Sequence, residues 1–353
     1  MKGGLDKVLN LFKKDLAIDL GTANTLVYTK KNGMLIREPS VVAVRNNNNR
    51  QEILAVGEEA KKMIGRTSGN ILAIRPMKDG VIWDFEMTAV MLSHFISKAC
   101  KRKRLFKPRT VICIPSGVTS VEKKSVIDVA LQAKAGEVYL IEESMAAAIG
   151  ADMPVSNPAG NMIVDIGGGT TDIAIISLEG IVVSNSIRVA GDEMTEAIIH
   201  HMKNNYNILL GENKAEEIKI NFGSAFFTNY SEIQADTRVD ICGRDAMTGL
   251  PKTIEINCEE LQGALASTVN QIVSAVKVVL DQTPAELCGD IMDKGIVMTG
   301  GGSLLRGLDK TLSNRLGVPA YLVDNPLECT AIGAWKVVQS LDKYNRFLIG
   351  FKS

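Results

Sequence analysis

The apolar positions of this chain recur with two spacings, and together they predict a protein of mixed strands and helices. Residues 110–114 and 138–141 are short apolar runs of the kind that form buried strands, while 118–133 and 143–150 have the spacing of helices. Strands that alternate with helices in this way are typical of an α/β lobe. Later in the chain, residues 258–280 predict a long helix with one apolar face.

The stretch 162–176 joins two apolar strands through a glycine-rich turn. The first strand runs into Asp165, and the chain then turns on the glycines 167–169. Because glycines carry no side chain, the backbone N–H groups of such a turn can close on an anion. Thr170 and Thr171 add hydroxyl donors, and the Asp165 carboxylate could hold a hydrated metal ion against phosphates. The stretch predicts a phosphate-binding hairpin, although a glycine-rich hairpin alone is more often only a turn.

The same design occurs near the start of the chain. Residues 16–28 contain an apolar strand, an acid at Asp19, a small polar turn led by Gly21, and a second apolar strand. Aligning Asp19 with Asp165 also pairs Gly21 with Gly167. This internal repeat predicts two similar halves that present their turns to one ligand from opposite sides of a cleft.

A third glycine-rich turn follows a late apolar strand. The strand 295–298 leads into the sequence TGGGS at 299–303, and a helix is expected at 304–316. A glycine-rich turn between a strand and a helix lets the backbone approach a ligand closely. We therefore expect this turn to contact a base or a ribose.

Size and composition narrow the class of protein. At 353 residues the chain is long for a single core, so two domains or one bilobed body are expected. Lys and Arg number 40, as do Asp and Glu, so bulk charge does not favour nucleic acid. The six cysteines are scattered without a CxxC motif, which suits buried thiols in a reducing compartment, and the three histidines do not predict a zinc site. No apolar run approaches the roughly 18 residues of a spanning helix, and no signal peptide is evident, so a cytoplasmic protein is expected.

The first fourteen residues could contact a membrane surface. Leu5, Leu9 and Phe12 fall on one side of a short helix, with lysines largely elsewhere. A helix this short is marginal in water unless its apolar side is covered. The alternatives are a frayed terminus or a helix docked on the body.

A basic segment supports the same interpretation. Residues 101–107 carry a cluster of Lys and Arg around Leu105 and Phe106, just before Pro108. Basic residues are attracted to anionic lipid, and the two apolar side chains could insert. An ordinary solvated loop is the alternative, and nucleic acid is disfavoured because no row of aromatic residues is interleaved.

Taken together, these motifs resemble a known group of proteins. The two hairpins, a helix that opens with Glu143 and the late TGGGS turn are similar to the actin, Hsp70 and hexokinase ATPase superfamily. From about residue 15 to about residue 335 the match is closer, to the MreB family of bacterial actin-like shape-determining proteins. The segments that carry it are LGTANTLVY, EPSVVAV, IRPMKDGVI, VEKKSVIDVA, YLIEESMAAAIGA, GNMIVDIGGGTTDIAIIS, IRVAGDEMTEAI and GIVMTGGGSLLRGL.

The resemblance implies a fold and its division. The expected fold is α/β: an actin-like bilobed ATPase fold of two related α/β lobes, each with a smaller inserted subdomain. The implied parts are 1–32, 75–145 and 325–353 for the first large subdomain, 33–74 for its insertion, 146–183 and 243–324 for the second large subdomain, and 184–242 for its insertion.

The resemblance also implies roles for individual residues. Glu143 would position the attacking water, helped by a hydroxyl of Thr170 or Thr171, and Asp19 and Asp165 would hold Mg²⁺ through water. Phosphoryl transfer to water needs mainly a metal ion, donors and one group that polarises the nucleophile, which agrees with this set. The residues implied to bind ATP are Asp19, Gly21, Thr22, Ala23, Asn24, Asp165, Gly167, Gly168, Gly169, Thr170, Gly191, Glu216, Lys219, Gly300, Gly301, Gly302 and Ser303.

Three positions depart from the family pattern. In CTAIGAW, Ile332 stands where many relatives carry a basic residue. The motif usually written GGGTTE ends here in Asp172, which could retune hydrolysis or only rearrange hydrogen bonds. The motif IEEP is here IEES, with Ser144 in place of proline, a mild change at a helix start.

The implied function is that of a filament-forming ATPase that polymerises on the inner face of the cell membrane and maintains cell shape, with slow hydrolysis. Its expected partners are further copies of the chain in paired filaments, an anionic membrane surface, and paralogues or membrane shape and cell-wall proteins, but not nucleic acid. The alternatives are a soluble ATPase of chaperone type, a small-molecule kinase with a carboxylate base beside an acceptor pocket, and a plasmid-segregation actin without a membrane loop.

Overall fold

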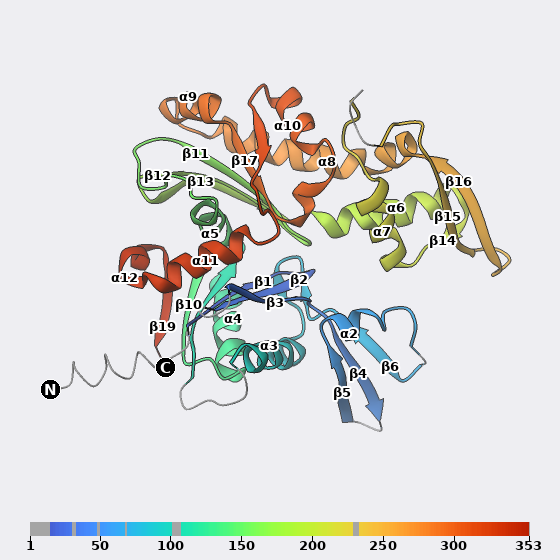
Figure 1. Ribbon diagram of the computed structural model, residues 1–353, viewed down its shortest axis with the longest axis horizontal. Coiled ribbons are helices and arrows are strands. Elements are labelled where there is room, and N and C mark those ends of the chain that lie inside the picture. The colour runs from blue at the N-terminus through green and yellow to red at the C-terminus, as the bar shows by residue number, and fades with distance from the viewer. Residues whose placement is uncertain are drawn as a thin grey trace. The chain divides into compact units, whose positions relative to one another are not determined.

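Two β-sheets of related topology form from the alternating strands and helices, one in each of two units (Figure 1). Unit 1 comprises Met1–Asn157 and Leu327–Ser353, and unit 2 comprises Pro158–Pro326. This computed structural model describes residues 15–29, 33–47, 50–67, 69–100, 107–228 and 233–352. The α/β class expected from the sequence is confirmed in both units.

The sheet of unit 1 has six strands. Asp15 lies opposite Arg109 in its register, and two side-chain hydrogen bonds of 2.9 and 3.0 Å between them hold the two strands together. The strand order is β19 (Ile349–Lys352), β10 (Glu137–Glu142), β9 (Arg109–Ile114), β1 (Asp15–Leu20), β2 (Asn24–Thr29) and β3 (Gly33–Pro39).

The sheet of unit 2 repeats this arrangement. Strand β11 pairs antiparallel with β12 and parallel with β17, as β1 does with β2 and β9. In the two registers Asp165 lies opposite Asp172, and Asp19 lies opposite Leu26. The internal repeat predicted from the two hairpins is therefore also a repeat of sheet topology. The strand order is β13 (Gly180–Ile187), β12 (Thr171–Ser177), β11 (Asn161–Ile166), β17 (Ile296–Thr299) and β18 (Ala320–Leu322).

Helices cover both faces of the unit 1 sheet (Figure 1). On one face, α3 (Phe85–Cys100) and α4 (Ser120–Gln132) share a core with the sheet, and Phe95 is fully buried there. On the other face, α5 (Glu143–Gly150) packs against α11 (Cys329–Gln339), which also contacts β1 and β9. Burial on both faces explains why the residues of these strands are apolar in continuous runs.

Small residues allow α5 and α11 to cross closely. A Cβ atom on Gly333 would lie 1.7 Å from the Ala146 carbonyl oxygen, and one on Gly150 would lie 2.0 Å from that of Cys329. The alanine run 146–148 therefore serves a tight helix–helix contact within unit 1.

Each unit also contains a small three-stranded sheet. In unit 1 its strands are β5 (Arg50–Val56), β4 (Val42–Asn47) and β6 (Ile71–Ile74). The remaining elements of unit 1 are the short helix α2 (Glu58–Lys61), the hairpin β7 (Met77–Lys78) and β8 (Val81–Ile82), and, after α11, the short helices α12 (Leu341–Tyr344) and η2 (Asn345–Phe347). Unit 2 has β14 (Ile208–Leu209), β15 (Arg238–Asp245) and β16 (Pro251–Asn257).

The helices of unit 2 are α6 (Gly191–Tyr206), α7 (Glu212–Phe222), α8 (Cys258–Asp281), α9 (Ala285–Lys294) and α10 (Leu308–Leu316). The apolar face predicted for α8 is confirmed, because its members are buried in the core of the unit. In the described part of the chain, α8 is the one helix that is long and apolar enough to cross a membrane. Helices in the cores of other proteins also have this length and composition. In the sheet of unit 2, α8 contacts β12 and β13.

Several predicted boundaries fall inside observed elements and are corrected. Divisions after residues 145, 183 and 242 would cut α5, β13 and β15. Strand β3, placed by sequence in the insertion 33–74, belongs to the six-stranded sheet. A strand pairs with its neighbours through backbone hydrogen bonds, so it is assigned to the sheet in which it pairs. The division into two large subdomains with two insertions remains a prediction.

Other elements were missed by sequence or misplaced. The helix expected from residue 304 begins at Leu308, because Gly301–Leu304 forms the 3-10 turn η1. The polar segment 204–237 contains the end of α6, β14 and α7. Helix α7 buries only Ala215 and Ile218, so its sequence lacks an apolar stripe.

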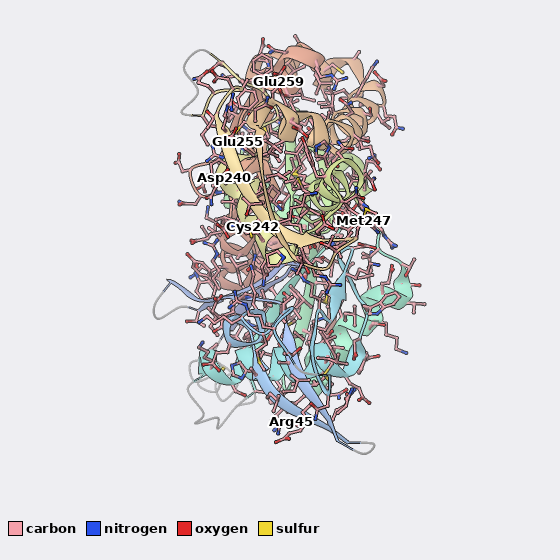
Figure 2. All side chains as sticks on the ribbon, turned by 90° about the vertical axis from the view of Figure 1, so that its right-hand side faces the viewer. Arg45, Asp240, Cys242, Met247, Glu255 and Glu259 are labelled. Atoms are coloured by element: carbon pink, nitrogen blue, oxygen red, sulfur yellow. The ribbon has the colours of Figure 1, made fainter. Side chains whose placement is uncertain are left out.

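The expectation that all cysteines are buried is also corrected. Cys242 is exposed and Cys288 is partly exposed, whereas the other four are buried. Figure 2 shows Cys242 along the β15–β16 hairpin with Asp240 and Glu255. Alternate residues of a strand face opposite sides, so Cys242 shares the solvent-facing side with Asp240. Burial raises the pKa of the Cys258 thiol.

The close crossing of α5 and α11 predicts that Gly333→Ala destabilises the protein, because the added methyl group would overlap the Ala146 carbonyl. Overpacking of this kind costs about 1–3 kcal/mol or more. Gly263→Ala in α8 is the matched control, since nothing lies within 4 Å of a Cβ there, and it should raise the free energy of unfolding by up to about 1 kcal/mol. Urea unfolding measures both, and equal effects would contradict the crossing.

Candidate functional site

The first glycine turn connects β1 to β2, and Ser40 forms hydrogen bonds with its backbone. Gly21 has no room for a side chain, because a Cβ would lie 2.6 Å from the Asn24 carbonyl oxygen. The Ser40 hydroxyl donates to the Gly21 carbonyl at 2.7 Å and lies 2.9 Å from the Thr25 hydroxyl. The Ser40 N–H donates to the Ala23 carbonyl at 3.0 Å. This fully buried serine therefore fixes the shape of the turn.

Three further predicted site residues lie in unit 1. Asp19 is half-buried near the end of β1, and Glu143 is half-buried as the first residue of α5. Thr22 is buried, and its hydroxyl oxygen accepts from the Gly80 N–H at 2.9 Å. A threonine hydroxyl can accept one bond and still donate its own proton, so Thr22 keeps the capacity to bind an anion.

The second glycine turn connects β11 to β12. Its ends are joined by a bond of 2.8 Å from the Gly167 N–H to the Thr170 carbonyl. Thr171 is fully buried and its hydroxyl donates to the Val189 carbonyl at 2.7 Å, so it supports the backbone that leads into α6. A catalytic role for Thr170 or Thr171 stays a prediction.

The first turn of α6 packs against this glycine turn. The Gly191 N–H donates to the Gly167 carbonyl at 3.2 Å, and the Asp192 N–H donates to the Gly168 carbonyl at 2.8 Å. In a trans peptide the C=O and N–H groups point in opposite directions. The N–H groups of Gly168 and Gly169 are therefore directed away from α6, side by side, as in an anion-binding nest.

Helix α7 contributes a positive charge beside the same turn. The Lys219 ammonium donates to the Gly191 carbonyl at 2.6 Å and to the Thr195 hydroxyl at 2.8 Å. These bonds fasten α7 to the first turn of α6. Glu216 lies three residues earlier, on the same side of α7, and is half-buried. The ribose contacts expected of Glu216 and Lys219 stay predictions.

The third glycine turn packs onto the end of β11. Gly300 has a φ of +84°, and a Cβ there would lie 2.3 Å from the Ile166 carbonyl oxygen and 2.4 Å from Asp165 Oδ1. A Cβ on Gly302 would lie 2.5 Å from Ile166 Cγ2 and 3.1 Å from the Gly167 carbonyl oxygen. This turn therefore packs against both Asp165 and the second glycine turn.

Hydrogen bonds hold the third turn against the end of α7. Ser303 is fully buried and donates to the Gly300 carbonyl at 2.6 Å. The Arg306 guanidinium donates to the Ile220 carbonyl at 2.8 Å, and the Ala225 N–H donates to the Arg306 carbonyl at 2.7 Å. Lys219 and the third turn are thus fixed relative to each other through backbone contacts.

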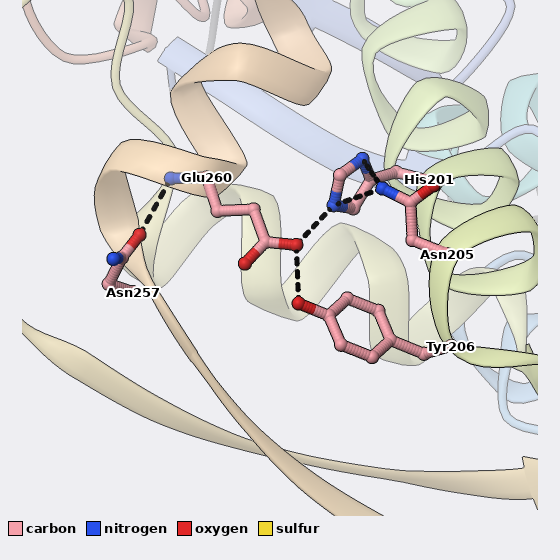
Figure 3. Close-up of polar contacts among 5 residues, drawn as sticks. All are labelled: His201, Asn205, Tyr206, Asn257 and Glu260. Atoms are coloured by element: carbon pink, nitrogen blue, oxygen red, sulfur yellow. Dashed lines mark hydrogen bonds and ion pairs between the residues drawn. The ribbon is translucent and has the colours of Figure 1, made fainter.

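The far end of α6 is fixed by a side-chain cluster (Figure 3). One oxygen of Glu260, in the first turn of α8, accepts from the Tyr206 hydroxyl at 2.7 Å and lies 2.7 Å from His201 Nε2. Burial raises the pKa of Glu260, but the bonds from Tyr206 and His201 outweigh it and leave the pKa below its usual value. The same bond to Glu260, aided by burial, raises the pKa of Tyr206. Helix α6, about 24 Å long, is held at both ends.

The structure brings together the predicted residues of unit 2 around one end of its sheet. These are Asp165, Gly167, Gly168, Gly169, Thr170, Gly191, Lys219, Gly300, Gly301, Gly302 and Ser303, with Glu216 on the same helix as Lys219. In unit 1, Asp19, Gly21, Thr22, Ala23 and Asn24 surround the first turn. The predicted membrane residues Leu5, Leu9, Phe12, Leu105 and Phe106 lie outside the described residues.

Sequence reasoning missed the residues that support these turns. Ser40 lies in the segment EPSVVAV, but it bonds to a residue 19 positions away, and no local pattern signals such a contact. Thr195 bonds to a residue 24 positions away, and Arg306 bonds to one 86 positions away. The only hint for Ser40 was a small polar residue inside an apolar run.

The depressed pKa of Glu260 predicts a pH-dependent effect of Glu260→Gln. A group whose pKa is lowered by folding contributes stability above its unfolded pKa of about 4.3 and loses it as pH falls through the folded value. The substitution should therefore cost about 1–2 kcal/mol at neutral pH and progressively less below about pH 4. Glu259→Gln, on an exposed neighbour, is the control. Urea unfolding measures the loss of stability caused by Glu260→Gln. A loss that does not change with pH would contradict a charged Glu260 in the cluster.

The chain is similar to proteins named as cell shape-determining proteins. The chain is 49% identical over 333 residues to the cell shape-determining protein Mbl of Bacillus subtilis (strain 168), covering 94% of this chain and 98% of that protein. It is 47% identical over 343 residues to the cell shape-determining protein MreB of Escherichia coli (strain K12), covering 96% and 97%.

Solved structures show the same fold. Crystal structures of MreB5 of Spiroplasma citri bound to ADP and to AMPPNP each match with a TM-score of 0.87 at 36% identity, over 95% of this chain and 98% of that chain. A MamK double helical filament matches with a TM-score of 0.77 at 22% identity, over 93% and 99%, which shows the fold alone. The family model described as MreB/Mbl protein matches residues 13–346. The chain has the actin-like fold and belongs to the MreB/Mbl family.

Proposed function

We propose that this chain binds ATP, assembles into filaments with further copies of itself and maintains cell shape, hydrolysing ATP slowly. The observation that carries the proposal is the meeting, in unit 2, of the second glycine turn, whose Gly167 and Gly168 carbonyls are held by α6, with the Lys219 ammonium and the third glycine turn. Donors, a positive charge and close backbone access are what a nucleotide needs. Relatives named cell shape-determining proteins, and a relative solved with ADP and AMPPNP, support it.

Each glycine turn supplies groups of the kind that bind nucleotide phosphates. At the second turn the Gly168 and Gly169 N–H groups donate to phosphate oxygens, while at the first turn Thr22 supplies a hydroxyl. Glu216 and Lys219 contact the ribose, and the third turn accommodates the base, because glycines there leave the backbone uncovered. These are the roles that the resemblance of the sequence implies.

The residues present fit a magnesium ion. Asp19 and Asp165 are carboxylates at equivalent ends of β1 and β11, and magnesium is usually held by one or two carboxylates together with waters and substrate phosphates. Among the described residues no group of three His, Cys, Asp or Glu side chains forms a cage for a metal, which suits an ion that arrives with its nucleotide. When bound, magnesium would neutralise negative charge on the phosphates.

Hydrolysis requires that a water oxygen attack the γ-phosphorus while the bond from that phosphorus to the bridging oxygen breaks, giving ADP and phosphate. The Glu143 carboxylate accepts a hydrogen bond from this water and orients it. A hydroxyl of Thr170 or Thr171 assists it. Few groups contribute, so a slow reaction follows.

Filaments of this protein act in the cytoplasm on the inner face of the membrane. Local features support the membrane part: the basic segment around Leu105 and Phe106, and the apolar residues Leu5, Leu9 and Phe12. Further partners are paralogues and membrane shape or cell-wall proteins. The competing function is a soluble ATPase or small-molecule kinase of the same superfamily that does not polymerise.

Sedimentation tests the proposed function. The purified chain should pellet with ATP and remain largely in the supernatant without nucleotide, because nucleotide binding favours the assembling state. Phosphate release is followed in the same tubes. If the chain releases phosphate but stays in solution with ATP at every concentration, the proposed ATPase activity is retained and the proposed filament assembly is rejected.

The same assay with anionic liposomes tests the membrane part. Liposomes should carry the wild-type chain into the pellet, and the double variant with Leu105→Ser and Phe106→Ser should bind them less, because each serine removes apolar surface that can insert. Neutral liposomes are the control for charge. Unchanged binding by the double variant would show that Leu105 and Phe106 do not attach the chain to the membrane.

Glu143→Ala separates hydrolysis from binding. The variant should bind ADP as the wild type does, while phosphate release falls by about 10²–10⁴-fold, the usual contribution of a positioned acid–base group. Glu217→Ala, an exposed acid on α7, is the control. If Glu143→Ala released phosphate at the same rate as the wild type, the proposed role of Glu143 in hydrolysis would be rejected.

A further inference from the structure

Two buried serines join the first turn of α5 to the end of β9. Ser144, the second residue of α5, is fully buried, and its hydroxyl lies 3.1 Å from that of Ser116, which is 4% exposed. Ser116 follows the last residue of β9 by two positions and donates to Glu142 Oε2 at 3.2 Å. Because a hydroxyl has a single proton, and Ser116 gives its own to Glu142, Ser144 donates the bond between the serines. The hydrogen bonds therefore run in one direction, from Ser144 through Ser116 to the Glu142 carboxylate.

This serine pair lies at the edge of the unit 1 sheet that carries the first glycine turn. Strands β1, β9 and β10 are parallel, and Asp19, Cys113 and Ile141 are paired across them. The segments that follow these three positions therefore leave the sheet at one edge, the edge where α/β sheets place their ligands. The first glycine turn follows β1, Ser116 follows β9, and Glu143 follows β10 as the first residue of α5.

Helix α5 depends on contacts with other elements for its position, because it has only eight residues. At its C-terminal end the Lys336 ammonium donates to the carbonyls of Ile149 and Gly150, at 3.2 Å each. At its N-terminal end the side chain of the N-cap residue, Glu142, makes no capping bond and accepts from Ser116 instead. The serine pair therefore links the first turn of α5 to the neighbouring strand.

We propose that Ser144 and Ser116 are positioning residues for ATP hydrolysis, which hold the first turn of α5 so that the Glu143 carboxylate is placed to orient the attacking water. The inference rests on the proposed function, because Glu143 has this role only if the chain hydrolyses ATP. A group that orients a reactant must be held within about 0.5 Å of its productive position. A bond from the adjacent residue of the helix limits the movement of the backbone that carries Glu143. The serines act through Glu143 and do not contact the reacting atoms.

The test compares phosphate release with ADP affinity for the full-length chain. Ser144→Ala removes the first donor, and phosphate release should fall about tenfold while the affinity for ADP stays that of the wild type. Ser116→Ala should have the same effect, and the two substitutions together should lower the rate no further than either alone, because they remove one shared bond. Ser144→Thr keeps the hydroxyl and should restore most of the rate. Ser125→Ala is the matched control, since that hydroxyl donates to the Val121 carbonyl of its own helix, α4.

A second comparison shows whether the serines act through Glu143. In the Glu143→Ala background, Ser144→Ala should leave phosphate release unchanged, because no carboxylate is left to misplace. A further tenfold fall in that background, or release at the wild-type rate by Ser144→Ala alone, would overturn the inference and leave the proposed function intact. Equal losses of phosphate release and of ADP affinity would show a structural role and would also overturn it. A wild type that binds ADP but releases no phosphate would instead overturn the proposed hydrolysis, and this inference with it.

Discussion

The two bonds between the first turn of α6 and the glycine turn of β11–β12 are the constraint on which the unit 2 site depends. They turn the carbonyls of Gly167 and Gly168 toward the helix, and the planarity of the peptide then directs the next N–H groups the other way. Lys219 and the third glycine turn are positioned on the same framework. If α6 shifted, every donor that converges on this place would shift with it. The Glu260 cluster at the opposite end of α6 therefore belongs to the support of the site.

The parts of this arrangement that the sequence predicted are those encoded locally. An acid followed by a glycine turn between two apolar strands is visible in a dozen residues, and its repetition predicted the shared topology of the two sheets. The supporting contacts could not be predicted in this way. Ser40 and Lys219 act on residues 19 and 28 positions away, and nothing in their neighbours specifies the partner. The boundaries of the small insertions failed for a related reason, because strand pairing across the sheet, and not composition, decides where β3 and β15 belong.

The repeat also separates what the fold needs from what the chemistry needs. Both halves keep an acid at the same place in the central strand, with an antiparallel neighbour on one side and a parallel neighbour on the other. The residues beside that acid differ, with Leu26 and Cys113 in one half and Asp172 and Thr299 in the other. Two copies of one design have thus diverged in polarity while their backbone pairing stayed the same.

The close crossing of α5 with α11 has a consequence for how the chain is made. Unit 1 contains both ends of the sequence: α11 and β19 from the C-terminal segment complete its helical layer and its sheet. Unit 2 is one continuous segment. During synthesis from the N-terminus, unit 2 can finish folding while unit 1 still lacks an edge strand and a covering helix. The half of the protein that is synthesised first is therefore the half that is completed last.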